Sequence, residues 1–159
     1  MNDEYADAYR GHSGFRSTDD DAVFELEGVD FEAWIRIDTP SVLLISSVPT
    51  LNATVTGDPV APVVEEGWFE TLERRLEDAP SVTDGDVGEP MVTREETTIR
   101  VETPLRSDPD DAPADAIAVA NYVEGTWIQG IIPGYEYDDQ VSGIRDRGRT
   151  SDTDPVERS

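Results

Sequence analysis

His12 and Ser13 are the first residues of the chain whose types could do chemistry. A serine hydroxyl beside an imidazole can act as a nucleophile with its general base, and His12 is the only histidine. The fold normally assembles such pairs in space, whereas these two residues are neighbours in the turn-forming stretch "GHSG" at 11–14. We therefore expect His12 to be an exposed loop residue, and the sequence predicts no catalytic residue.

Clusters of carboxylates are the second candidate, because oxygen ligands bind hard cations such as Ca²⁺. The stretch "DPDDAPAD" supplies four of them: Asp108, Asp110, Asp111 and Asp115. It lacks the central glycine and the terminal glutamate of a calcium loop. Asp and Glu make up 36 of the 159 residues, so clusters of this kind arise from composition alone. We expect no metal site, and no pair of carboxylates stands out as an acid–base pair.

Nucleotide cofactors are not indicated either. The chain has no Gly-rich dinucleotide-binding pattern, and the Gly-Lys-Ser/Thr end of a phosphate-binding loop cannot occur because the chain contains no lysine. Cysteine is also absent, which excludes a disulfide framework, a thiolate zinc site and a cysteine nucleophile. The sequence therefore predicts no cofactor.

The charge of the chain indicates a saline environment. The formal net charge is −24, and all 12 basic residues are arginine. Guanidinium is weakly hydrated, and in multimolar salt a Debye length of about 3 Å or less screens the repulsion between carboxylates. High net charge is also typical of disorder, but three Trp, four Phe, five Tyr and several apolar runs favour a folded chain. We expect a halophilic globular protein.

The N-terminal stretch "MNDEYADAYR" has neither the basic region nor the apolar core of a signal peptide. No apolar run approaches the roughly 20 residues that cross a bilayer. We therefore expect a soluble protein of the cytoplasm.

Hydrophobic periodicity predicts a single α+β domain over residues 1–137. A short helix is expected at 3–10, and two long helices at 64–79 and 114–130. Strands are expected at 23–28, 29–38, 41–49 and 51–55, with one or two more between 87 and 105. The expected architecture is one antiparallel sheet of about four to six strands, in the order α-β-β-β-α-β(β)-α. Residues 138–159 have little to bury and are expected to form a flexible tail.

The two long helices differ in their apolar surfaces. In the first, Val64, Trp68, Leu72 and Leu76 recur every four residues, which predicts one stripe packed on the sheet. The second is apolar around most of its circumference, more than one sheet face can cover. We therefore predict a homodimer or partner surface formed by five residues: Tyr122, Trp127, Ile128, Ile131 and Ile132.

These features favour a non-enzymatic protein-interaction or chaperone-like module. Two alternatives remain open. The first is an enzyme or small-ligand binder with a pocket between sheet and helices, using Arg36, Arg100 or a buried carboxylate. The second is nucleic-acid association through the tail, where every second residue of "IRDRGR" is basic: Arg145, Arg147 and Arg149.

Two stretches carry a resemblance to a known family. "PTLNATVTGDPVAPVVEEGWFETLERRLEDA" at 49–79 and "VANYVEGTWIQGIIPGYEY" at 119–137 resemble a haloarchaeal domain of unknown function. This resemblance implies an archaeal organism and a cytoplasmic location, and it implies no activity. The order of elements is also similar to that of type III secretion chaperones, which bind other polypeptides and commonly dimerise; this is an analogy of architecture.

Overall fold

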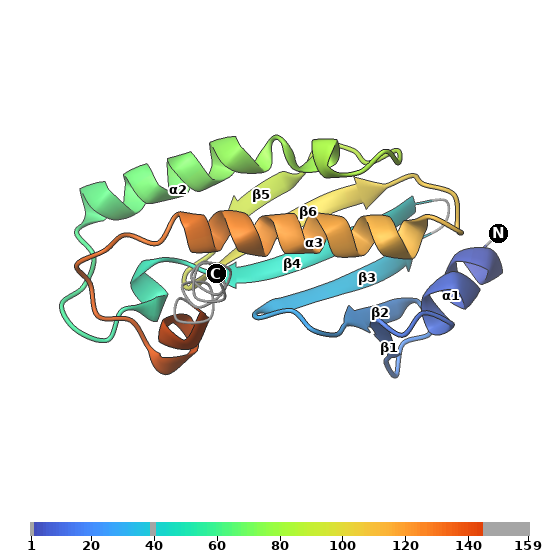
Figure 1. Ribbon diagram of the computed structural model, residues 1–159, viewed down its shortest axis with the longest axis horizontal. Helices are drawn as coiled ribbons and strands as arrows, with labels where there is room; N and C mark the ends of the chain where they lie inside the picture. Colours follow the sequence, from blue (N-terminus) through green and yellow to red (C-terminus); the bar gives the residue numbers. More distant parts are fainter. Residues whose placement is uncertain (1, 39–40, 145–159) are drawn as a thin grey trace, which may run out of the picture.

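The structure is a computed structural model that describes residues 2–38 and 41–144. Its centre is one six-stranded antiparallel sheet with the order β1-β2-β3-β4-β6-β5 (Figure 1). The strands are β1 (Phe15–Ser17), β2 (Val23–Leu26), β3 (Glu32–Asp38), β4 (Ser41–Pro49), β5 (Met91–Arg94) and β6 (Thr98–Leu105). The helices are α1 (Asn2–Arg10), α2 (Pro62–Leu76) and α3 (Ala112–Gln129), with 3₁₀ turns η1 (Asn52–Thr54) and η2 (Ala79–Val82) and a short helix over residues 139–144. The predicted α+β class with a single antiparallel sheet is confirmed.

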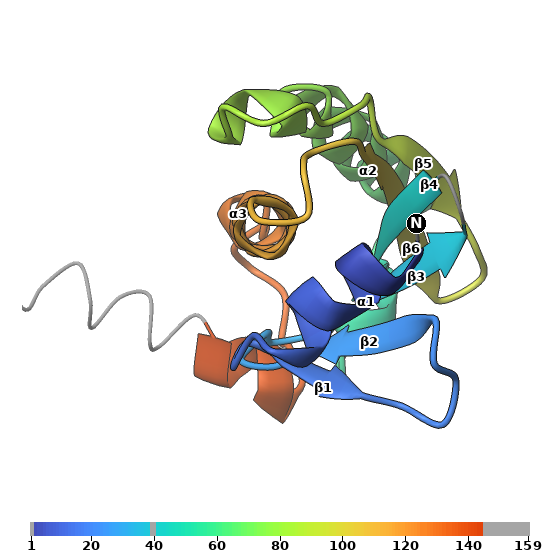
Figure 2. The same ribbon diagram turned by 90° about the vertical axis from the view of Figure 1, so that its right-hand side faces the viewer.

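All three long helical elements lie on one side of the sheet (Figures 1 and 2). α3 crosses the middle of that side, with α2 and α1 flanking it. The alternation of side chains along β3 distinguishes the core face of the sheet from the opposite face. Ala33, Ile35 and Ile37 belong to the core. Arg36 and Asp38 are exposed on the opposite face. The opposite face carries no helix from the described part of the chain.

Residues 91–105 form a hairpin of two strands. The sequence pattern had left open whether this region contains one strand or two. β5 pairs with β6 from Met91 opposite Glu102 to Arg94 opposite Ile99. The backbone N–H of Glu95 donates to the Thr98 carbonyl (2.7 Å), which closes the turn. At the other edge, β1 was not predicted, because a strand of three residues is too short to show an alternating pattern.

The strand predicted at 51–55 is wrong, since this segment forms η1. Asn52 Oδ1 accepts a hydrogen bond from the backbone N–H of Val60 (2.7 Å), and Thr54 Oγ1 donates to the Leu51 carbonyl (2.7 Å). Local bonds of this kind between side chain and backbone stabilise a turn in place of a strand ladder. The alternation of Leu51, Ala53 and Val55 therefore does not correspond to one buried side, since Leu51 and Thr54 are buried and Ala53 is exposed.

The packed part of the chain continues beyond Tyr137, where the sequence analysis ended the domain. Residues 139–144 are helical, and the side chains of Val141 and Ile144 are buried. Gln140 Nε2 also donates a hydrogen bond to the carbonyl of Asp30 (2.7 Å). Two apolar residues three positions apart are enough to dock one helical turn, and the polar composition of the tail obscured them.

Trp127 is the largest of the fully buried side chains and joins four parts of the fold. Its Nε1 donates a hydrogen bond to the carbonyl of Pro49, at the end of β4 (2.8 Å). Its ring meets Phe31 and Trp68 edge-on, with 5.0 and 6.3 Å between ring centroids. One residue of α3 therefore holds β4, α2 and the segment before β3 together.

Replacing Trp127 by Phe should destabilise the protein more than replacing Trp68 by Phe. Both changes remove the same atoms from buried positions, but only Trp127 donates a hydrogen bond, and its loss leaves the Pro49 carbonyl without that donor. We expect Trp127→Phe to exceed Trp68→Phe by about 1–2 kcal/mol in the free energy of unfolding, measured in urea at constant KCl. Equal losses in the two variants would contradict this assignment of the hydrogen bond.

Candidate functional site

A groove of about 390 Å³ lies between α2 and α3, which run side by side in opposite directions (Figure 1). Its walls include Val64 and Leu72 from α2 and Thr126 from α3. Val63, on the rim, is 79% exposed, which is unusual for a large aliphatic side chain in this molecule. The groove is thus largely apolar and open to solvent.

The groove is closed at one end by a direct link between the helices and kept open elsewhere by glycine. The hydroxyl of Tyr122 donates a hydrogen bond to the Arg75 carbonyl (2.8 Å), which fixes α3 against the C-terminal end of α2. Gly67 lines the groove two turns earlier, and no other atom lies within 4 Å of the position that a Cβ would occupy there. A helix-interior glycine costs about 1 kcal/mol relative to alanine, and here it leaves space at the groove.

Two polar groups in the groove lack partners among the described residues. Trp68 Nε1 is buried and donates no hydrogen bond, and it lies 3.5 Å from where a Cβ would be at Gly130. Arg75 also lines the groove, and its guanidinium is in none of the ion pairs that the described residues form. A buried N–H without an acceptor costs about 1–3 kcal/mol.

Only part of the predicted five-residue partner surface is accessible to solvent. Trp127 is fully buried in the core, so its assignment to that surface is wrong. Ile132 lines the groove, while Ile128, Ile131 and Tyr122 are half-buried and pack against the core. The sequence argument assumed that only the sheet would cover α3, whereas α1, α2 and η2 pack against it as well.

Sequence reasoning missed Val63, Gly67 and Arg75 as groove residues. One signal was present: Gly67 interrupts a helical pattern, and an isolated glycine in such a pattern often has a packing or functional reason. Val63 lies outside the apolar stripe that begins with Val64 and Trp68, so the sequence also indicated that Val63 is exposed. The distance between α2 and α3 could not be predicted from the sequence, because it depends on how both helices pack on the sheet.

The sequence profile of a family of unknown function, DUF5813, matches residues 10–147. The chain belongs to this family. The match covers both walls of the groove and the short helix at 139–144, and the predicted likeness to a domain of unknown function is confirmed. No curated protein and no solved structure matches the chain. Over residues 2–38 and 41–144, no helix is long and apolar enough to cross a membrane.

Arg36 and Arg100 do not point between the sheet and the helices of the DUF5813 chain. Both lie on the uncovered face of the sheet, since the register places Arg36 opposite Leu43 and Arg100 opposite Ser47, on the side away from the core. The Arg100 Nε donates to Glu102 Oε2 (2.8 Å). The arginine-lined pocket of the first alternative is therefore not formed by these two residues. Arg145, Arg147 and Arg149 of the second alternative lie outside the described residues.

The first alternative, an enzyme or small-ligand binder, also named a buried carboxylate. One is present: Glu124, in α3. Its side chain accepts hydrogen bonds from the backbone N–H groups of Asp30 (2.9 Å) and Phe31 (2.7 Å), in the turn before β3. Burial raises the pKa of Glu124, and the two backbone hydrogen bonds oppose that shift. Its place is structural: it satisfies the N–H groups of the turn and fastens that turn to α3.

His12 and the aspartates around the start of α3 also hold local structure. His12 Nδ1 accepts a hydrogen bond from the N–H of Gly14 (2.9 Å), and its ring meets Phe15 edge-on. Asp115 accepts a hydrogen bond from the hydroxyl of Ser107, and the carbonyl of Asp108 accepts from the turn that begins α3. In the described part of the chain, no three His, Cys, Asp or Glu residues are grouped to hold a metal ion.

The raised pKa of Glu124 predicts how its contribution to stability varies with pH. The folded state binds this proton more tightly than the unfolded state, whose carboxyl has a pKa of about 4.3. The contribution is therefore fully present below that pH and is lost as the pH rises through the folded pKa. Urea unfolding between pH 4 and 8 should show the stability of the parent, relative to Glu124→Gln, falling with increasing pH.

Glu73→Gln, on the exposed side of α2, is the matched baseline for removing one negative charge. If the stability of the parent relative to Glu124→Gln instead rises with pH, the two backbone hydrogen bonds to the carboxylate outweigh its burial, and the stated direction is wrong.

Proposed function

We propose that this DUF5813 protein is a non-enzymatic protein-interaction module that holds a short apolar segment of another polypeptide in the groove between α2 and α3. The observation that carries the proposal is the open apolar groove itself, with Val63 exposed at its rim. Contiguous exposed apolar surface usually marks an interaction site. A groove between two helices suits an apolar segment whose side chains enter at regular spacing.

The polar groups of the groove indicate the chemistry of the bound segment. Arg75 would pair with an acidic side chain, because its guanidinium is in none of the ion pairs among the described residues. Trp68 lies two helical turns from Arg75, which is about 10 Å along α2. The expected ligand is thus a short peptide with two or three aliphatic residues and one Asp or Glu.

The groups that could otherwise do chemistry support a role other than catalysis. His12 and Glu124 each accept hydrogen bonds from backbone N–H groups, so their lone pairs are used in holding turns. Asp115 is engaged with Ser107. None of the three lines the groove. A general base has to reach a bound substrate, which these residues do not do from their positions.

Filling the groove at Gly67 tests the proposal without unfolding the protein. Gly67→Leu introduces a side chain where no atom lies within 4 Å of the new Cβ, and it also improves helix propensity. Gly125→Leu is the matched control: this α3 glycine has the same open surroundings but does not line the groove. The probe is a library of ten-residue peptides with two or three Leu, Ile or Val and one Asp or Glu, screened by fluorescence anisotropy in 2 M KCl.

We expect peptides of this class to bind the parent and Gly125→Leu alike, and to lose at least tenfold in affinity on Gly67→Leu. Arg75→Glu should weaken binding of peptides with an acidic residue and leave their alanine analogues unchanged. If no peptide binds more tightly than about 1 mM, or if Gly67→Leu leaves binding intact, the groove is not a polypeptide site.

We further propose that the chain works in concentrated salt, as the arginine-only basic composition favours. The ion pairs formed by the described residues are all at least partly exposed, so they offset little of the repulsion among carboxylates. Screening by salt would relieve that repulsion.

Raising KCl from 0.1 to 2 M should raise the Tm of the protein. The rise should be smaller in the triple variant Glu70→Gln, Glu73→Gln and Glu77→Gln, which removes three exposed charges from α2 and hence part of the repulsion that salt relieves. Thermal unfolding followed by circular dichroism measures both. A Tm that is independent of salt in the parent would contradict the halophilic assignment.

A further inference from the structure

The uncovered face of the sheet has an apolar centre. Its middle strand is β4, whose outward residues are Leu43, Ile45 and Ser47. Ile45 is fully buried although no helix from the described part of the chain lies over it, and it does not belong to the core on the other face. Side chains of the same face therefore cover it, among them Trp34, which is directly opposite it on β3. The centre of this face is therefore apolar, while charged residues surround it.

The same face is nearly neutral in a strongly acidic molecule. Seven charged residues point outward from its strands: Arg16, Glu25, Glu32, Arg36, Asp38, Arg100 and Glu102. Three are arginines and four are acidic, whereas the whole chain carries a formal charge of −24. Two copies of this chain repel each other over most of their surfaces, and they can approach most closely where the local charge is near zero.

We propose that two copies of this chain associate face to face through the uncovered side of the sheet. A two-fold axis running along β4 brings Leu43 of one copy, which is half-buried, onto Leu43 of the other, beside the side chains that cover Ile45. The axis exchanges the neighbours of β4, which are β3 and β6. Two sheets pack in this way at a separation of about 10 Å, with outward residues meeting at the centre.

The register makes this arrangement self-complementary in charge. Glu32 on β3 and Arg100 on β6 both lie opposite Ser47 of β4, one on each side of it. The two-fold axis therefore places Glu32 of each copy opposite Arg100 of the other, which forms two ion pairs. Arg100 is already held near this position, since its Nε bonds Glu102 and its guanidinium lies 5.9 Å from the Trp34 ring centroid.

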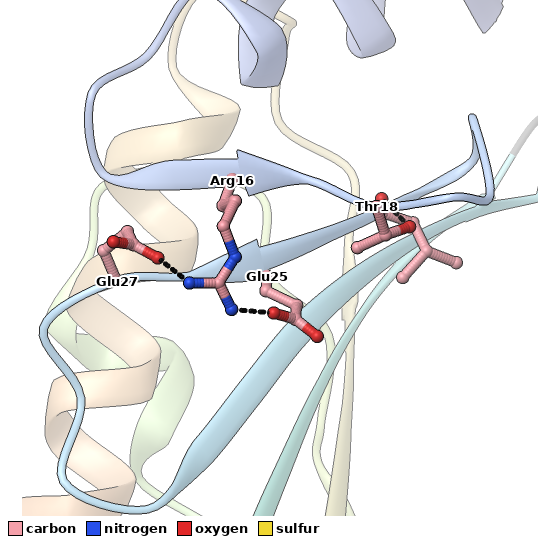
Figure 3. Close-up of polar contacts among 5 residues, drawn as sticks. Arg16, Thr18, Glu25 and Glu27 are labelled. Atoms are coloured by element: carbon pink, nitrogen blue, oxygen red, sulfur yellow. Dashed lines mark hydrogen bonds and ion pairs between the residues drawn. The ribbon is translucent and has the colours of Figure 1, made fainter.

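At the edge of the face, Arg16 is bound within its own chain. It pairs with Glu27 (2.8 Å) and with Glu25, so two carboxylates of the same chain already bind this guanidinium (Figure 3). Arg36, by contrast, is exposed and takes part in none of the ion pairs among the described residues. Next to the apolar centre, Arg100 is paired with Glu102, whereas Arg36 has no ion-pair partner among the described residues.

The size of the face suits a dimer. Central strands of seven to nine residues are about 23–30 Å long, and six strands spaced about 4.8 Å apart span about 24 Å. The planar area is about 600 Å², close to the roughly 800 Å² of accessible surface that each partner buries in a standard interface. The groove between α2 and α3 lies on the other side of the sheet, so dimerisation leaves it accessible.

A charge exchange between Glu32 and Arg100 tests the proposal. Arg100→Glu sets two carboxylates against each other in both ion pairs, and the double variant Glu32→Arg with Arg100→Glu restores them in reverse. Both variants lose the bond to Glu102, and the double variant has the same net charge as the parent. Arg74→Glu, exposed on α2, is the control for net charge. Sedimentation equilibrium of the full chain at 0.3 and 3 M KCl measures the dimer dissociation constant, and circular dichroism checks folding.

We expect the parent and Arg74→Glu to dimerise, Arg100→Glu to raise the dissociation constant at least tenfold at 0.3 M KCl, and the double variant to recover most of that loss. Leu43→Asp should abolish the dimer at both salt concentrations. A parent that stays monomeric at about 0.5 mM overturns the proposal, whether another partner covers the face or none does. A dimer that neither Arg100→Glu nor Leu43→Asp weakens overturns it too, because association then uses another surface.

Discussion

The packing of α3 across the middle of the sheet is the contact on which the other features depend. Trp127 is its anchor, because the indole is fully buried and donates to the carbonyl at the end of β4. With α3 in this position, α2 can only lie beside it, and the space left between them is the groove. All helical layers are then on one face, which leaves the other face of the sheet with no helix from the described residues.

Charge is the second constraint on the molecule. A formal charge of −24 disfavours close approach to any other acidic surface, so sites of association are restricted to surfaces that are locally neutral or apolar. The groove and the uncovered sheet face meet that condition in different ways. The groove is apolar with one arginine at its end, while the sheet face balances three arginines against four acidic residues around Ile45.

Buried polar groups separate the structural from the interacting parts of the fold. Glu124 and His12 have the residue types of catalytic groups, yet their acceptor atoms bind backbone N–H groups of nearby turns. Trp68 Nε1 has the opposite character, since it is a donor left without an acceptor beside a groove. A satisfied buried group stabilises the fold, whereas an unsatisfied one lowers its stability.

The sequence by itself determined the fold class, both long helices and most strands, because periods of 2.0 and 3.6 residues report directly which side of an element is buried. It failed at 51–55 and at β1, where side-chain bonds from Asn52 and Thr54 or a length of three residues override the pattern. Only the tertiary structure decided that Trp127 is core, and that Gly67 and Arg75 share a groove. These outcomes depend on which other elements cover a given side chain, and that is a property of long-range packing that no local period records.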